Sequence, residues 1–295
     1  MQVSRQALLF CFALLLAGTA PFTMAQNRDS MGSRGMVDED FSQSYSLSSQ
    51  GRVSLKNVCG DIVIQSWNRD EVLVEAVKTA HSAERLAEAV IRVDADGDSV
   101  RIETEYPSYG SFSCSGSKGW SNESRIMAAS VAYTLTVPRS ARIDEVKVVN
   151  SNVDLSDLDG DVHISTVNGD VTASALQGRA RLSTVNGRID AEGVSGPIEF
   201  STVNGTLDVH MASLESGQKV SLKSVNGEVI LRLPRGAAVE VEASSVHGRI
   251  RNDFGWEVDE GRYVGRSLRA NTGRDGARVK LSTVNGTIRI AEAGR

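Results

Sequence analysis

The chain has 295 residues, a formal net charge of −5 and only 5% aromatic residues. These values argue against a nucleic-acid-binding protein, which would need a clustered basic face, and against broad aromatic stacking platforms. Five prolines and 27 glycines are typical of turn-rich β structure, and no motif predicts a cofactor or a metal.

Residues 1–25 predict a secretory signal peptide. Arg5 provides the positive start, residues 7–17 are mostly apolar, and Ala25 ends a short run with small residues at the cleavage-relevant positions. No other stretch approaches 18 consecutive apolar residues, the length of a membrane-spanning helix. We therefore expect an exported protein, periplasmic, cell-surface or secreted, with no transmembrane span in the mature chain.

The next segments predict a flexible leader over residues 26–40 and a β-rich N-terminal portion over 41–140. Ser82 is placed to cap a short helix through residue 90, and Asp96 with Gly97 is a hairpin signal. Cys59 and Cys114 are the two cysteines left after cleavage. In an oxidising compartment such a pair predicts a disulfide, with two unpaired thiols as the alternative.

A repeated motif dominates residues 141–292, the predicted β-solenoid repeat region. Ser-Thr-Val-Asn-Gly stands at 165–169, 183–187, 201–205 and 282–286, with weaker copies ending at Gly227 and Gly248. The first three copies are 18 residues apart, and glycines midway between them halve the step to nine. A fixed short period is typical of a solenoid, in which each unit buries its apolar side against its neighbours.

Nine-residue rows starting at residue 150 are apolar at their fourth, sixth and ninth positions, as in Val171, Ala173 and Leu176. Positions four to six alternate as a half-buried strand does. Since the next inward residue is expected at position nine, the chain should bend near positions seven and eight. This favours parallel coils of about 18 residues, each with two short strands and two turns. Asn-Gly is also a strong hairpin signal, so an antiparallel arrangement stays open.

The turns of this all-β, parallel β-solenoid contain Asn and Gly, which tolerate the positive φ of tight turns. Parallel coils would stack the asparagines, so that their amides hydrogen-bond along the stack. The predicted turn ladder comprises Asn150, Asn168, Gly169, Asn186, Gly187, Asn204, Gly205, Asn226, Gly227, Asn285 and Gly286. Residues 252–276, with Phe254 and Trp256, interrupt the period as a lateral loop or as a cover for the solenoid.

The repeated rows, such as Ser-Thr-Val-Asn-Gly-Asp-Val at 165–171, resemble the bacterial putative-adhesin family, a domain-of-unknown-function group of exported β-solenoid proteins. The preceding strands and the Ser82 helix resemble that family's N-terminal portion, so the resemblance covers residues 40–292. It implies an extracytoplasmic scaffold in surface adhesion or envelope-stress pathways, and it supplies no catalytic residues.

Three patterns suggest chemistry. The repeated Ser-Thr pairs lack an adjacent base, because only His163 lies in an outward column of the regular coils. Asp161 and Asp170 lie at positions like those of calcium β-rolls, but arginines replace them further along the column. Asp190 and Asp208 would lie about 4.8 Å apart on adjacent strands, near enough for a two-carboxylate hydrolase, or they are simply solvated acids.

We therefore predict an exported, non-catalytic β-solenoid scaffold, a putative adhesin or envelope-associated binding protein whose partner is an envelope protein or glycan. Two alternatives remain. One is a carbohydrate-active β-helix enzyme that uses Asp190 and Asp208, and the other is a periplasmic accessory protein of an envelope-stress circuit.

Overall fold

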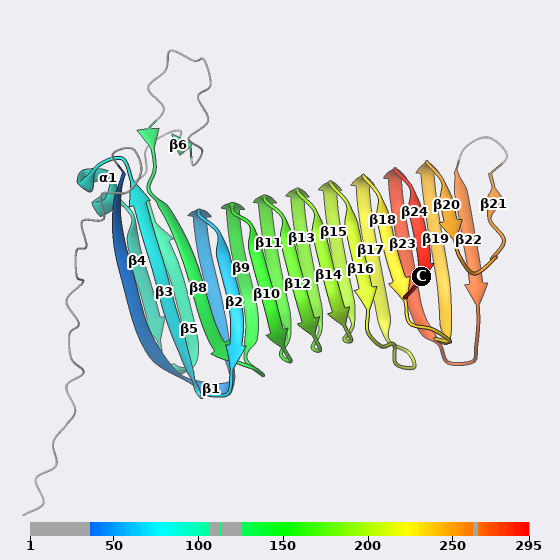
Figure 1. Cartoon of the computed structure of the whole chain (residues 1–295), viewed down its shortest axis with the longest axis horizontal. Helices are drawn as coiled ribbons and strands as arrows, with labels where there is room; N and C mark the ends of the chain where they lie inside the picture. The colour runs from blue at the N-terminus through cyan, green and yellow to red at the C-terminus, as the bar shows by residue number, and fades with distance from the viewer. Residues whose placement is uncertain (1–35, 107–111, 114–125, 262–264, 295) are drawn as a thin grey trace, which may run out of the picture.

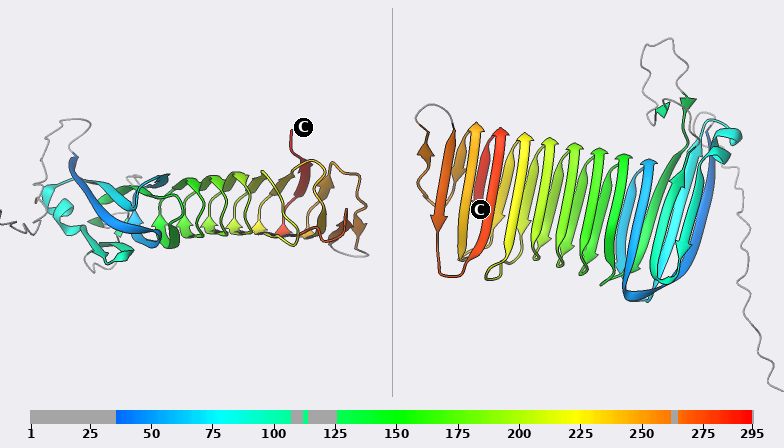
Figure 2. Two further views of the ribbon diagram at one scale, coloured as in Figure 1. Left: turned by 90° about the horizontal axis from the view of Figure 1, so that it is seen from below. Right: turned by 180° about the vertical axis from the view of Figure 1, so that it is seen from behind.

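The structure, a computed structural model, describes residues 36–106, 112–113, 126–261 and 265–294. The predicted signal peptide, most of the predicted leader, and Cys114 lie outside these ranges. The described chain forms two long, mostly parallel sheets that face each other along the molecule (Figure 1). Seen from below in Figure 2, the chain winds from one sheet to the other and back, so the fold is solenoid-like.

Sheet A is parallel from β8 to β20. In spatial order it contains the first part of β1 (Val37–Cys59), β3 (Glu71–Ala80), β8 (Ser130–Pro138), β2 (Ile62–Trp67), β10 (Val153–Leu158), β12 (Val171–Leu176), β14 (Ile189–Val194), β16 (Leu207–Met211), β18 (Val229–Leu233), β24 (Ile288–Glu292) and β20 (Ile250–Asn252).

Sheet B is parallel from β5 to β19. In spatial order it contains β4 (Val90–Ala95), β5 (Gly97–Glu105), the second part of β1, β9 (Arg142–Asn150), β11 (Val162–Asn168), β13 (Ala180–Asn186), β15 (Ile198–Asn204), β17 (Lys219–Asn226), β23 (Ala277–Asn285), β19 (Val239–His247), β22 (Arg266–Asn271) and β21 (Asp259–Glu260). The parallel pairing rules out the antiparallel alternative for the repeats.

The N-terminal portion contains the predicted helix and hairpin. Helix α1 (Ala83–Glu88) begins after Ser82, whose hydroxyl accepts the backbone N–H of Arg85 at 3.4 Å. Strands β4 and β5 pair antiparallel around Gly97, which has a φ of 87°. Val90 lies in β4 and is exposed, so the helix ends at Glu88 and the prediction that it continues through residue 90 is wrong. Two short strands, β6 (Phe112–Ser113) and β7 (Ile126–Met127), form a separate parallel pair.

The core lies between the two sheets and is filled by the inward side chains of each strand. Phe200 of β15 is fully buried and is paired in register with Leu182 on one side and Leu222 on the other. Corresponding residues of successive sheet B strands, such as Asn150 at the end of β9 and Asn168 at the end of β11, are 18 residues apart in the central steps. From Asn204 to Asn226 the separation is 22, because a longer loop follows β16.

The expected slip in alternation occurs in sheet A but not in sheet B. In sheet A, Ala175 has a φ of 52° and Gly193 has a φ of 70°. One left-handed residue of this kind directs the side chain that follows it, such as Leu176 at the ninth position, back into the core. The described repeat strands of sheet B, from β11 to β17, have no such residue before their valines. Thr184 is therefore buried there and Val185 is exposed, so the prediction of an inward valine in the Ser-Thr-Val-Asn-Gly rows is wrong.

The repeated glycines serve close packing, and positive φ is not the reason for most of them. Gly169, Gly187 and Gly205 do not adopt it. A Cβ on Gly187 would lie 2.0 Å from the carbonyl oxygen of Gly169, and one on Gly205 would lie 1.8 Å from that of Gly187. Successive turns therefore approach too closely for any side chain at this position.

The chain order departs from the spatial order at both ends of the stack. Strands β1 and β2 lie between β5/β8 and β9/β10, while β23 and β24 lie between β17/β18 and β19/β20. Figure 1 shows this as colours out of sequence at each end. The excursion after β20 supplies β22, which pairs antiparallel with β19 at the end of sheet B. In the same excursion Phe254 and Trp256 stack with ring centroids 4.5 Å apart and pack half-buried against the core, so this segment acts as a cover.

Candidate binding faces and their chemistry

An exposed row of valines crosses the outer face of sheet B near the ends of its strands. We call it the valine stripe; its members are 36% to 45% exposed and, in spatial order, are Val149, Val167, Val185, Val203, Val225, Val284 and Val246. Each comes from a different strand of the parallel ladder, so the row is continuous. Contiguous exposed apolar surface of this kind marks an interaction site more often than scattered single residues do.

A ladder of asparagine amides runs beside the valine stripe at the corner of the coils. Each Nδ2 donates to the Oδ1 of the asparagine before it in the stack. The donor and acceptor pairs are Asn168 to Asn150 at 2.8 Å, Asn186 to Asn168 at 2.8 Å, Asn204 to Asn186 at 2.9 Å, Asn226 to Asn204 at 2.9 Å and Asn285 to Asn226 at 2.8 Å. The amides hold one another in place, which makes this edge a regular polar row.

The corner hydroxyls bond to the backbone. Thr184 donates to the carbonyl of Gly169 at 3.1 Å, and Thr202 donates to that of Gly187 at 3.2 Å. Ser183 donates to the carbonyl of Ile164 at 3.2 Å. These hydroxyls therefore satisfy backbone acceptors of the preceding coil and do not form a nucleophile–base pair with a histidine.

The aspartates that follow the turns also have backbone partners. Asp161 accepts the N–H of Arg179 at 3.1 Å, and Asp170 accepts the N–H of Arg188 at 2.7 Å. Within the described ranges, no group of three or more His, Cys, Asp or Glu side chains is placed to hold a metal ion. Asp161 and Asp170 thus tie neighbouring coils together.

The two candidate catalytic acids lie on the outer face of sheet A, where Asp190 and Asp208 are paired in register. Arg188 contacts both, with its Nε 3.4 Å from Asp190 and its Nη2 3.3 Å from Asp208. Arg232 also donates to Asp208, which is only 9% exposed. Neither arginine shares the column of the two acids: Arg188 precedes Asp190 by two residues, and Arg232 pairs in register with His210. This geometry resembles an ion-pair network more than an acid beside a free nucleophile.

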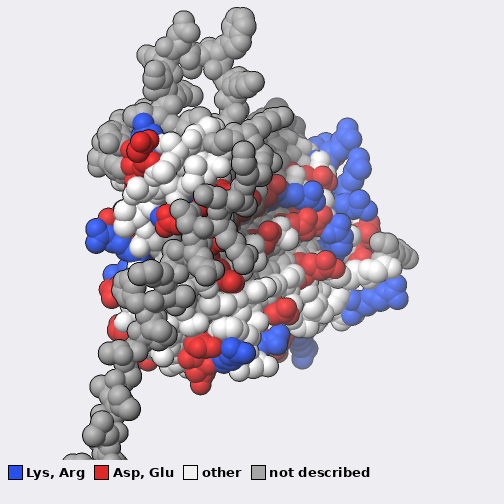
Figure 3. Space-filling view, turned by 60° about the vertical axis from the view of Figure 1, so that its left-hand side comes forward, with Lys and Arg blue, Asp and Glu red and all other residues white. Residues whose placement is uncertain are grey.

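Charges of both signs alternate on the surface. In Figure 3 acidic and basic side chains are interspersed over the face shown. On sheet B, the Lys147 ammonium lies 2.7 Å from Glu145 and, by hydrogen bonding, lowers the pKa of that carboxyl. Such exposed pairs contribute little stability but prevent a single-sign field along the sheet.

Cys59 lies next to Asn150 in the register of sheet B, beyond the last amide of the ladder. It is fully buried and takes part in a disulfide. Cys114 lies outside the described residues, so the pairing of these two cysteines stays a prediction. No helix of the described part of the chain is long and apolar enough to cross a membrane.

A comparison with solved structures finds matches at low sequence identity. A putative cell adhesion protein from Clostridium sporogenes is 12% identical, with a TM-score of 0.37, and the alignment covers 86% of this chain and 99% of that one. A putative adhesin from Parabacteroides distasonis is 10% identical, with a TM-score of 0.42 and coverage of 86% and 97%. A putative adhesin from Bacteroides fragilis is 12% identical, with a TM-score of 0.36 and coverage of 85% and 96%.

A comparison with curated protein sequences finds no match. The model of one protein family, described as Toastrack DUF4097, matches residues 50–291, which include the coils at both ends of the stack. The chain therefore belongs to the Toastrack DUF4097 family.

Proposed function

We propose that this protein is an exported, non-catalytic binding scaffold that engages an envelope protein or glycan along the outer face of sheet B. The observation that carries the proposal is the valine stripe beside the asparagine ladder. Together they form a long, repeated surface with apolar and amide groups in adjacent rows. A partner that lies along the stack would make the same contact at each coil of about 18 residues.

Two further features support a scaffold. The regular ladder fixes the surface before binding, so little conformational entropy is lost on association. The only outward acids considered for catalysis, Asp190 and Asp208, are engaged by Arg188 and Arg232.

The face is tested by placing charge in the stripe. Val185→Asp together with Val203→Asp should strongly reduce capture of ligands enriched from envelope extracts or on a glycan array, because desolvating two carboxylates opposes apolar contact. Both sites are exposed, so the fold should persist. Thr172→Asp with Ser174→Asp, two exposed positions on sheet A, is the control with the same change in charge. Equal loss in both variants would remove sheet B as the binding face.

Deleting residues 168–185 tests whether binding is spread over the repeats. The deletion removes one coil and leaves Asn186 to follow Val167, so the stack should shorten by about 4.8 Å and binding should weaken gradually. The parent protein should not cleave glycans. If it does, and if Asp190→Asn or Asp208→Asn abolishes the cleavage, the protein is a hydrolase and the scaffold proposal is wrong.

Export is tested on protein recovered from the cell envelope. N-terminal sequencing should find a mature start at Gln26. Thiol titration of the denatured, unreduced protein should detect no free thiol, since Cys59 and Cys114 would be bonded. An intact N-terminus with two free thiols would contradict export through an oxidising compartment.

A further inference from the structure

The long loop after β16 departs from the repeat and forms a groove. In the preceding coil the turn from β14 to β15 spans only residues 195–197. After β16, the backbone N–H of Ala212 bonds to Val194, and the side chain of Gln218 reaches the carbonyl of Gly196 at 2.6 Å. Ala212 and Gln218 thus both contact the preceding coil, and residues 213–217 are inserted between them.

The inserted loop is held by specific contacts. Gln218 is 7% exposed, and its Oε1 accepts the backbone N–H of Glu215 at 2.8 Å. Ser216 donates to the carbonyl of Asp275 at 2.7 Å, which ties the loop to the segment before β23. These contacts hold the loop in place beside the N-terminal ends of the sheet B strands. The valine stripe lies near the C-terminal ends of the same strands.

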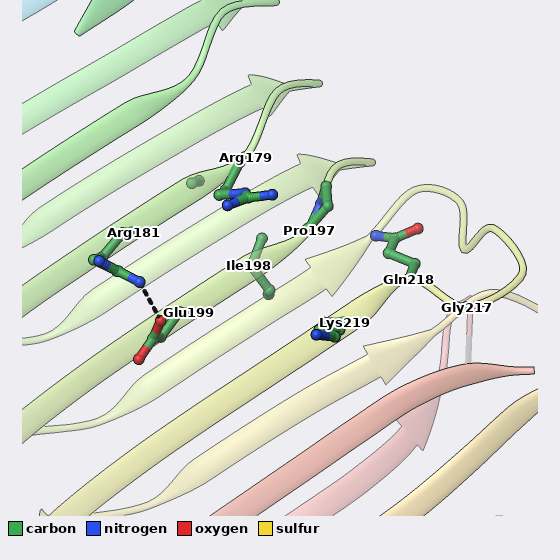
Figure 4. A pocket seen from close by; sticks show the side chains of 9 residues that line it. Arg179, Arg181, Pro197, Ile198, Glu199, Gly217, Gln218 and Lys219 are labelled. Carbon is green, nitrogen blue, oxygen red and sulfur yellow. Dashed lines mark hydrogen bonds and ion pairs between the residues drawn. The ribbon is translucent and has the colours of Figure 1, made fainter. Parts of the chain in front are cut away.

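Beside this loop lies an open groove of about 440 Å³ across the starts of β13, β15 and β17 (Figure 4). Pro197 lines the groove between Arg179 and Lys219. The residues that follow these three, Ala180, Ile198 and Val220, are paired in register across the three strands. Arg179 and Lys219 therefore flank Pro197 at about two strand spacings, roughly 10 Å between backbones.

The charges in the groove leave two cations available. Arg181 pairs with Glu199 at 2.8 Å, the contact drawn in Figure 4. Arg179 and Lys219 are exposed, and neither forms an ion pair with any described residue. The charged residues that line the groove are Arg179, Arg181, Lys219 and Glu199, three cations and one anion. The groove is therefore locally positive and complementary to an anion.

We propose that this groove binds an acidic group of a polysaccharide, a uronate carboxylate or a sugar phosphate. Arg179 offers a planar fork of N–H donors from one side, and Lys219 offers an ammonium from the other. Pro197 provides an apolar surface for the sugar ring between them. A nucleic acid would require a longer basic stripe, which the Arg181–Glu199 pair interrupts. This site is separate from the proposed function, because the groove lies at the N-terminal ends of the sheet B strands and the valine stripe lies near their C-terminal ends.

The test uses the full mature protein and calorimetric titration with defined probes. Trigalacturonate and glucose 6-phosphate represent the two anion sources, and maltotriose is the neutral control. We expect at least one anionic probe to bind more tightly than maltotriose. Arg179→Gln with Lys219→Gln should weaken that binding by about tenfold or more, as loss of hydrogen bonds to a charged group does.

The matched control is Arg249→Gln with Arg251→Gln. It removes the same charge from two exposed arginines on β20 and the turn before it, at the far end of the stack. This variant should retain affinity within about twofold. Equal weakening in both double variants, no preference over maltotriose, or equal binding of tetraglutamate would each overturn the glycan site. Val185→Asp with Val203→Asp should leave anion binding intact, which separates failure of this site from failure of the sheet B face.

Discussion

The central coils and the two ends of the stack have similar strands, but they differ in whether neighbouring coils are also consecutive in the sequence. From β9 to β18 each coil lies on the coil that precedes it in sequence. At the C-terminal end, Asn285 joins the ladder on Asn226 at 2.8 Å although 59 residues separate them. The distance equals that between Asn168 and Asn150, which are 18 residues apart. Coils with the same turn asparagine therefore stack with the same geometry whether or not they are neighbours in the chain.

The ends differ from the centre in a second respect. Antiparallel strands border the parallel stack at both ends, with β3 and β4 at one and β22 at the other. A parallel stack leaves unpaired backbone groups at its last coil, which would recruit another chain. Strands β23 and β24, the last in the sequence, lie inside the stack, and the excursion that precedes them covers the last coil in space, β19 and β20. Terminal caps have the same role in other repeat proteins.

Removing the last coil, β19 and β20, together with its cover should have the largest effect. The carbonyl of Ala238 lies 2.9 Å from the N–H of Ala277, so deleting residues 239–276 joins two points that are already close. The shortened chain should keep its β circular dichroism but expose the edges of β23 and β24, and therefore form dimers or larger species. Light scattering after size exclusion measures this. A stable monomer would show that residues 239–276 do not protect the end of the stack.

Within the centre, Phe200→Ala should cost about 3–5 kcal/mol of unfolding free energy, because a fully buried ring leaves a cavity between adjacent coils. Glu199→Ala, one residue away and paired only at the surface with Arg181, should cost less than about 0.5 kcal/mol. Denaturant unfolding compares them. Equal costs would contradict the assignment of inward and outward positions.

Glycines at two kinds of turn should differ as well. Gly187→Ala should cost about 3 kcal/mol, since its Cβ would lie 2.0 Å from a backbone oxygen that cannot move without separating coils. Gly193→Ala should cost only about 1 kcal/mol, because the equivalent Ala175 already adopts a φ of 52°. A reversed order in denaturant midpoints would mean that backbone conformation, and not coil spacing, selects glycine at Gly187.

The smallest effect concerns the corrected orientation of the repeated motif. Thr184→Val should cost about 1 kcal/mol through loss of the hydrogen bond to Gly169. Val185→Thr, on the exposed side, should stay within about 0.5 kcal/mol. If Val185→Thr were the more destabilising change, the valine would face the core as the sequence frame suggested.

The sequence alone determined the strand period, the parallel preference and the Ser82 cap, because these depend on residue type at fixed local spacing. Export, the pairing of Cys59 with Cys114 and the division at residue 140 remain predictions. The described β1 already begins at Val37, inside the segment expected to be a flexible leader.

Only the tertiary structure decided which side of sheet B carries threonine or valine. Ser-Thr-Val and Ser-Ala-Leu look alike as patterns, and a single left-handed residue such as Ala175 separates them. The tertiary structure likewise placed residues 277–292 inside the stack and brought Arg179 and Lys219 to one groove. These outcomes depend on contacts between distant segments, which compete on packing and hydrogen bonding and leave no local periodic signal.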